Sequence, residues 1–139
     1  MIIFADTPAL FALLVHDDSM HARAKANFEY FVQNDTRLLT SSYVLLETLT
    51  LLQRRVSLEA AWDFDRKIVP ILDVVWVDKR WHNQALQRLQ AERSRSVSLT
   101  DCLSFEIMEA RALTTAFTFD GHFPERGFEI AAFHNLNAR

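Results

Sequence analysis

Four acidic residues lie where predicted strands and helices could carry them into a common cleft: Asp6, Glu47, Asp101 and Asp120. The first and the last each follow an apolar stretch whose length and composition predict a buried strand. The other two lie in segments with helical spacing. Because the carboxyl ends of parallel strands meet at one rim of a sheet, acids that are distant in sequence can converge there.

Three of these residues also have an ordinary local explanation. Asp6 could cap the helix that follows it, and Asp101 lies in a predicted first helical turn, where exposed amide groups favour an acid. Asp120 precedes Gly121, and Asp-Gly is a common turn signal. Taken one at a time, Asp101 and Asp120 are better explained by their local roles, whereas for Asp6 the local role and a role in a site are equally plausible.

Glu47 has no basic neighbour along its predicted helix. The residues three and four positions away are Tyr43, Val44, Thr50 and Leu51. Most of them are apolar, so no ion pair within the helix is available. Because burying a lone charge is costly, either a metal ion or a solvent-exposed helix edge would explain this glutamate.

Together, the four acids predict a metal site. Carboxylates that converge without basic partners repel one another, and Mg²⁺ or Mn²⁺ prefers carboxylate and water oxygens. A cation held in this way binds phosphate oxygens and lowers the pKa of a bound water, so a phosphodiester could be hydrolysed without a side-chain nucleophile. We expect Asp120 to act at a distance or through water, because a turn after a strand is easily displaced from the rim.

Composition narrows the class of protein. The length of 139 residues fits a single domain, residues 1–139, and the two glycines exclude a glycine-rich phosphate loop. One cysteine, Cys102, excludes an internal disulfide, which suits a cytoplasmic protein. Acids interrupt the N-terminal apolar run, so we expect neither a signal peptide nor a membrane span there.

Charge and hydroxyl groups indicate how a substrate could be held. The net charge of −3 argues against binding nucleic acid through bulk positive charge, so that charge must be local or come from a metal. Arg93 and Arg95 lie in a basic loop that could hold an RNA backbone, although a solvated loop explains them equally well. Thr7 and Thr118 could orient a water or an acid at the rim, or merely satisfy backbone groups.

The histidines give no independent metal signal. They lack the spacing of metalloproteases and zinc fingers: His16, His21, His82, His122 and His134. His122 is close to Asp120 in sequence and could approach the site, but a loop or packing role is the simpler interpretation.

Strands and helices alternate along the chain. Strands are predicted at 1–5, 38–40, 73–77 and 115–119, with an edge strand or packed tail at 128–132. Helices are predicted at 9–15, 21–33, 43–55, 58–69, 79–92 and 99–112. Their capping residues would be Thr7, Ser41 or Ser42, Ser57 and Asp78. This alternation predicts a parallel sheet with helices on both faces.

The sequence resembles a PIN-domain protein of the kind found in bacterial VapC-type toxins. The resemblance covers nearly the whole chain and rests on the order and spacing of five pieces: FADT at 4–7, TSSYVLLETLTLL at 40–52, SLTDCLSFEIME at 98–109, AFTFDGHF at 116–123 and Gly127-Phe128. One departure is Pro8, which stands where a small hydroxyl residue usually follows the Asp-Thr pair.

The resemblance implies a fold and an activity. The fold is a three-layer α/β/α sandwich around a short parallel sheet. The activity is that of a Mg²⁺- or Mn²⁺-dependent ribonuclease whose acidic cluster is Asp6, Glu47, Asp101 and Asp120. Family members often form homodimers, and toxin members are held inactive by a small antitoxin protein.

Other functions were weighed against this one. A phosphatase that forms an aspartyl-phosphate would need a second aspartate at the position of Pro8 and a lysine, and the chain has only three lysines. A non-catalytic PIN-like module for protein contacts would not need all four acids. The sequence does not decide between a toxin and an RNA-processing nuclease.

Overall fold

The computed structural model describes residues 1–132, so residues 133–139, with His134, lie outside the description. The strands are β1 (Ile2–Ala5), β2 (Arg37–Ser41), β3 (Leu72–Val75), β4 (Thr115–Phe117) and β5 (Glu129–Ile130). The helices are α1 (Thr7–Leu14), α2 (His21–Gln33), α3 (Ser42–Arg55), α4 (Leu58–Lys67), α5 (Lys79–Glu92), α6 (Leu99–Ala110) and α7 (His122–Glu125), with a 3-10 turn, η1, at Val69–Ile71.

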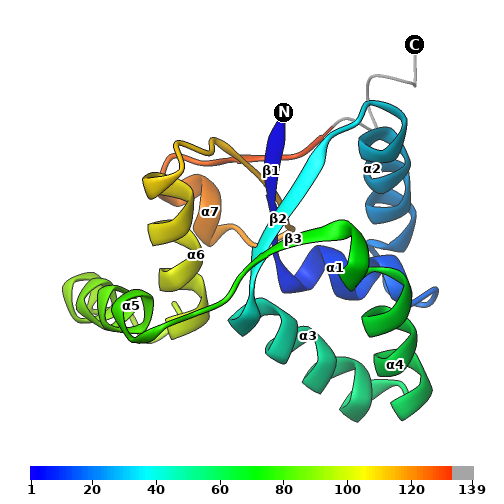
Figure 1. The fold of residues 1–139 in the computed structure, drawn as a ribbon, viewed down its shortest axis with the longest axis horizontal. Coiled ribbons are helices and arrows are strands. Elements are labelled where there is room, and N and C mark those ends of the chain that lie inside the picture. Colours follow the sequence, from blue (N-terminus) through cyan, green and yellow to red (C-terminus); the bar gives the residue numbers. More distant parts are fainter. Residues whose placement is uncertain (133–139) are drawn as a thin grey trace.

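The five strands form one sheet in the order β3-β2-β1-β4-β5, and every neighbouring pair is parallel. Helices α1 to α4 lie on one side of this sheet and α5 to α7 on the other (Figure 1). The predicted α/β/α sandwich around a short parallel sheet is therefore confirmed, and residues 128–132 contribute the edge strand β5 rather than a packed tail.

Apolar side chains fill the space on both faces of the sheet. Phe4 and Phe117, on the central strands β1 and β4, are fully buried, as are Leu10 of α1 and Phe105 of α6. Strands covered on both faces read as short continuous apolar runs, as they do here. Among the described residues, no helix is long and apolar enough to cross a membrane.

Most predicted helix boundaries agree with the structure because the caps form as expected. Ser41, Ser57 and Asp78 each accept a hydrogen bond from a backbone amide of the following helix. The start of α1 was predicted wrongly. The helix begins at Thr7 itself, with Asp6 at the capping position, because the extended backbone of β1 continues through Asp6.

Several other boundaries differ by one or two residues: β3 ends at Val75 instead of 77, β4 at Phe117 instead of 119 and α6 at Ala110 instead of 112. Helix α4 ends at Lys67 instead of 69, because Pro70 belongs to the 3-10 turn that leads into β3. The turn predicted at Asp120-Gly121 runs directly into the short helix α7, which was not predicted. These changes lie at the ends of elements and leave the order of the sheet unaffected.

Candidate active site

The carboxyl ends of β1 and β4 are joined at Asp6. The Asp6 backbone N–H donates to the Phe117 carbonyl at 3.0 Å. The Thr118 hydroxyl donates to Asp6 Oδ2 at 3.0 Å and accepts the Asp120 backbone N–H at 3.1 Å. Asp6 is the N-cap residue of α1, as considered from the sequence, but its carboxylate makes no capping hydrogen bond to the helix and accepts from Thr118 instead.

Asp101 reaches the same rim from the start of α6. The Ser98 hydroxyl accepts the Asp101 backbone N–H at 3.0 Å, and Asp101 Oδ2 accepts the Ser98 backbone N–H at 3.2 Å, forming a capping box. The local role is therefore real, and it fixes the side chain. Ligand atoms of Asp101, Asp120 and His122 all lie within 4.8 Å of one another.

The turn that carries Asp120 is held in place. Asp120 Oδ1 accepts the His122 backbone N–H at 2.9 Å, and the His122 Nδ1 atom lies 2.8 Å from the same oxygen. His122 Nε2 is 3.1 Å from the Ser96 hydroxyl in the loop between α5 and α6. Asp120 thus lies beside Asp101 instead of being displaced from the rim, because these contacts and Thr118 anchor its turn.

Glu47 approaches the rim from α3, on the opposite side from α6. Its side chain is exposed on the cleft wall. Beside it lies Thr7, which is 2 % exposed and whose hydroxyl accepts a hydrogen bond from the Thr48 hydroxyl at 3.1 Å. The Thr7 side chain therefore lies between β1 and α3, where it helps to place Glu47.

Mutual repulsion among the acids appears in their protonation behaviour. Burial raises the pKa of Asp6 to about 8, and the negative charge of Asp101 adds to the rise. Thr118 opposes it by donating to the carboxylate, and Glu47 raises it slightly further. Each acid of the group thus makes the ionisation of its neighbours harder.

Burial and repulsion between carboxylates also raise the pKa values of Glu47 on α3 and Asp101 on α6. Burial of its inner side raises the pKa of Glu47, followed by the charges of Asp101 and Asp120, while Thr7 lowers it. Burial also raises the pKa of Asp101, with a further rise from Asp120 that Ser98 and His122 partly offset. All four predicted acids therefore interact in one cluster.

The donor set of this cluster fits a divalent cation. Among residues 1–132, none of the four acids forms an ion pair with a lysine or an arginine, and the basic side chain in contact with them is that of His122, beside Asp120. Carboxylate oxygens at this density are what Mg²⁺ or Mn²⁺ binds. Such a cation would offset the repulsion that raises their pKa values.

Sequence comparison identifies the family. The PIN-domain family model matches residues 3–129.

This chain belongs to the PIN-domain family.

Two curated PIN-domain relatives are both described as 23S rRNA-specific endonuclease VapC20, from two strains of Mycobacterium tuberculosis, CDC 1551 / Oshkosh and H37Rv. Each is 32% identical over 127 residues, which cover 91% of this chain and 95% of the relative. The crystal structure of M. tuberculosis VapC20, described as a Sarcin-Ricin loop cleaving toxin, matches with a TM-score of 0.80 at 31% identity. That match covers 92% of this chain and 96% of the other. The resemblance to VapC-type PIN domains is confirmed.

The remaining residues that the sequence suggested for the site lie around the acidic cluster of this PIN domain. Arg93 and Arg95 are exposed on the loop between α5 and α6, and Ser96 of the same loop contacts His122. His122 was underrated from the sequence, where only its closeness to Asp120 hinted at a role. Thr118, which the sequence suggested could orient a water or an acid, donates to the Asp6 carboxylate and also connects it with the Asp120 turn.

Proposed function

We propose that this protein is a metal-dependent endoribonuclease in which residues 1–139 act as one catalytic domain. The observation that carries the proposal is the convergence of Asp6, Glu47, Asp101 and Asp120 at the carboxyl rim of the sheet without an arginine or lysine partner among the described residues. The two curated relatives, named as endonucleases that act on 23S rRNA, support RNA as the substrate.

Each residue has a role in the proposed reaction. The four acids hold Mg²⁺ or Mn²⁺. When bound, the cation supplies positive charge to the phosphate and makes a water molecule more acidic. Asp6, with a pKa of about 8, gives up its proton to take part.

Other groups place these acids and the RNA. Thr118 orients Asp6 and the Asp120 turn through its two hydrogen bonds. Thr7, which the sequence suggested as a substrate-binding residue, is only 2 % exposed, so it acts instead by positioning Glu47. Arg93 and Arg95 hold the RNA backbone in this proposal, which is supported by their exposure and by the ability of arginine to bind phosphate through two parallel hydrogen bonds.

We further propose that the protein is the toxin of a toxin–antitoxin pair, working in the cytoplasm and blocked by a small antitoxin protein. The relative whose structure matches is described as a toxin. Growth arrest on expression, lost in Asp101→Asn, would support this role. An adjacent small reading frame whose product restores growth would identify the antitoxin. An RNA-processing nuclease would cleave RNA without arresting growth.

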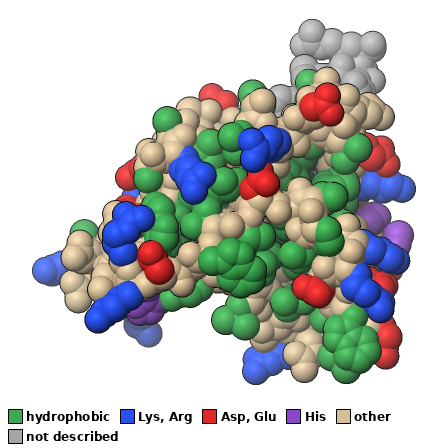
Figure 2. Space-filling model, in the orientation of Figure 1, with side chains coloured by type: hydrophobic (Ala, Val, Ile, Leu, Met, Phe, Trp, Pro, Cys, Tyr) green, Lys and Arg blue, Asp and Glu red, His purple; other side chains and the backbone are tan. Residues whose placement is uncertain are grey.

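A homodimer is part of the same proposal. Large apolar side chains are exposed on and around β3, α3 and α4: Leu46 at 65%, Trp62 at 53%, Ile71 at 55% and Trp76 at 72%. Hydrophobic side chains gather over the middle of the face that carries β3 (Figure 2). Exposed apolar surface of this kind marks an interaction site. Sedimentation of the wild type against Trp76→Glu measures whether a second copy covers it.

The test of the central proposal is RNA cleavage by the purified protein with and without Mn²⁺ or Mg²⁺. We expect metal-dependent cleavage that Asp6→Asn abolishes while the circular dichroism spectrum stays that of the wild type. A wild-type protein that folds but neither cleaves RNA nor binds a divalent cation would instead be a non-catalytic interaction module.

A further inference from the structure

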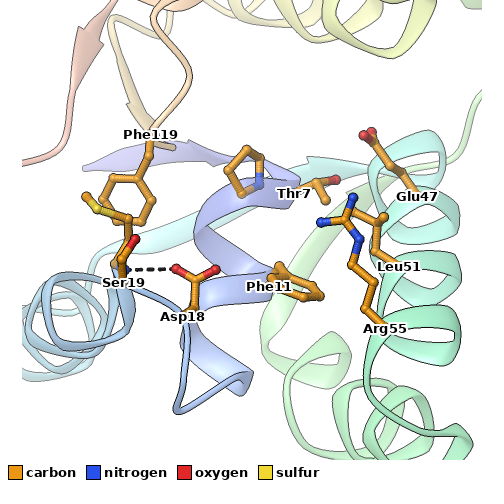
Figure 3. Close-up of a pocket in the computed structure, with 10 residues that line it drawn as sticks. Thr7, Phe11, Asp18, Ser19, Glu47, Leu51, Arg55 and Phe119 are labelled. Atoms are coloured by element: carbon orange, nitrogen blue, oxygen red, sulfur yellow. Dashed lines mark hydrogen bonds between the residues drawn. The ribbon is translucent and has the colours of Figure 1, made fainter.

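A cavity of about 310 Å³ opens beside the acidic rim. It shares Glu47 with the acidic cluster, and its lining includes Thr7 and Phe119, which directly follow Asp6 and precede Asp120. Figure 3 shows the cavity bounded by α1, by the turn before α2 and by α3. A group that occupies it would therefore lie next to an RNA phosphate held at the rim.

The size of the cavity restricts what it can hold. Pockets for small molecules range from about 300 to 1,000 Å³, so this one is at the small end and fits a single ring system. Its apolar lining includes Phe11 of α1, Leu51 of α3 and Phe119. Aromatic side chains are the surfaces on which unpaired RNA bases stack.

Three charged side chains line the cavity, and the two that lie outside the acidic cluster are Asp18 and Arg55. Asp18 lies in the turn before α2, half-buried, and its Oδ1 atom accepts the Met20 backbone N–H at 2.8 Å. Arg55 lies on α3, and within the described residues it forms no ion pair. In Figure 3, Phe11 lies between Asp18 and Arg55, so an acceptor and a donor stand on opposite sides of one space.

Three hydrogen bonds hold the turn that carries Asp18. The Asp18 backbone N–H donates to the Val15 carbonyl at 3.1 Å, and the Asp18 carbonyl accepts the His21 backbone N–H at 3.0 Å. With Oδ1 bound to Met20, the carboxylate has a fixed orientation before any ligand arrives. Preorganised polar groups of this kind discriminate between ligands more strongly than mobile ones.

The arrangement of donors and acceptors matches one base. Guanine presents two acceptors, O6 and N7, on one edge, and arginine binds this pair with two hydrogen bonds. Its other edge presents two adjacent N–H donors, which an ionised carboxylate can accept because it is an acceptor only. Adenine, cytosine and uracil do not offer both pairs together.

We propose that this cavity is a guanine subsite, in which Asp18 and Arg55 select an unpaired guanosine next to the cleaved phosphodiester. The inference rests on the proposed ribonuclease function and adds the identity of one nucleotide of its substrate. Nothing in the acidic cluster itself distinguishes one base from another, so the selection falls to these two side chains.

The first test measures binding without cleavage. GMP, IMP, AMP and UMP are titrated into the full protein without added divalent cations, and the amide shifts of residues 18–20 and 55 are followed by NMR. IMP lacks the amino group that Asp18 would accept. Discrimination by a good two-bond pair is roughly 5- to 150-fold, so GMP should bind at least about fivefold more tightly than IMP.

Neighbouring residues supply matched controls. Asp18→Asn should remove the preference for GMP over IMP, whereas Asp17→Asn, which makes the same change outside the cavity lining, should keep it. Likewise Arg55→Lys should weaken GMP binding, and Arg54→Lys should not. Equal binding of GMP and IMP by the wild type, or equal effects of the two aspartate variants, would overturn the subsite.

The second test measures cleavage of a randomised single-stranded RNA library, with the cut sites read by sequencing. The wild type should enrich guanine at one fixed position beside the cut, and Asp18→Asn should lose that enrichment. Cleavage with the same base preference in both proteins overturns the subsite and leaves the nuclease intact. GMP selectivity without any cleavage overturns the nuclease and leaves the subsite. If Asp18→Asn changes only inhibition by an antitoxin, the cavity is a protein site.

Discussion

Helix α6 carries acids of two clusters, and only one of these clusters has arginine side chains paired with its carboxylates. Near its start, Asp101 belongs to the acidic rim, where no described arginine or lysine is paired with any of the four acids. One and two turns further on, Glu106 and Glu109 each lie 2.9 Å from Nη1 of Arg88 on α5. One cluster is neutralised within the fold, whereas the other is left for a cation.

The neutralised cluster continues onto α7. Arg126 pairs with Glu92 and donates to the His122 carbonyl at 2.9 Å. The guanidinium groups of Arg88 and Arg126 lie 5.1 and 5.0 Å from the centre of the Phe105 ring. Hydrogen bonds from Arg126 lower the pKa of Glu92, whereas burial and repulsion raise that of Asp6. Glu92 is therefore suited to stabilising the fold through ion pairs, whereas Asp6 is suited to binding a cation.

The largest expected effect is on RNA cleavage, and it should differ between two substitutions on α6, one in each cluster. Asp101→Asn should reduce RNA cleavage at least about a thousandfold, because loss of a metal ligand removes several kcal/mol of charge stabilisation, while the midpoint of thermal unfolding stays equal or rises. Glu106→Gln should leave cleavage per folded molecule near that of the wild type and lower the midpoint. Similar loss of activity in both variants would break the comparison.

The pH dependence of stability should also differ between the clusters. The pKa of Asp6 is about 8 in the folded protein, against about 3.9 in an unfolded chain. The contribution of Asp6 to the free energy of unfolding is therefore most favourable at low pH. This contribution is lost as the pH rises from about 4 to about 8, by up to about 1.4 kcal/mol per pH unit. The pH dependence from Glu92 runs in the opposite direction. Because its pKa is lowered in the folded protein, its contribution to the free energy of unfolding is lost as the pH falls.

Urea unfolding of the metal-free protein at several pH values measures this difference. The free energy of unfolding of the wild type should fall toward alkaline pH more steeply than that of Asp6→Asn, and saturating Mg²⁺ should flatten the curve. Parallel curves for the two proteins would show that Asp6 ionises freely.

The Thr118 hydroxyl connects two members of the rim, so its removal should have an intermediate effect. Thr118→Val keeps the shape but loses both hydrogen bonds, and changes at the partners of metal ligands typically cost about 10- to 100-fold in activity or metal affinity. Thr115→Val, at the opposite end of β4 and away from the rim, is the control. Comparable losses in the two variants would mean that general packing of β4, and not the link to Asp6, is responsible.

The smallest expected effect concerns the neutralised cluster alone. Glu92→Gln should lower the free energy of unfolding by about 1 to 2 kcal/mol, because Arg126 is then partly buried without its charged partner. Glu125→Gln removes the other acid paired with Arg126, but that side chain is 68% exposed, so the loss should stay within about 0.5 kcal/mol. Equal losses would show that burial does not govern these pairs.

Much of the fold followed from local signals in the sequence. The bounds of α2 and α5 were predicted correctly because apolar periodicity and, for α5, the Asp78 cap are both local. Helix α7 was missed because its four residues are held by contacts made in three dimensions, such as that of Arg126 with the His122 carbonyl. Such contacts leave no periodic pattern in the sequence.

The site was partly predictable for the same reason. Acids at strand ends and without helical partners indicated Asp6, Glu47, Asp101 and Asp120, which the structure brings together. The Thr118 bridge depends on the register of β4 beside β1, and the cavity at Asp18 and Arg55 depends on how α3 packs against α1. Neither the bridge nor the cavity has a signature within one segment, so only the assembled fold reveals them.

The most direct test of cation binding at the rim is calorimetric titration of the metal-free protein with Mn²⁺ near neutral pH, repeated in two buffers with different ionisation enthalpies. Because Asp6 with a pKa of about 8 is mostly protonated there, binding should release close to one proton, and Asp6→Asn should abolish that release. Binding with no proton release, or no binding by a folded wild type, would contradict the account.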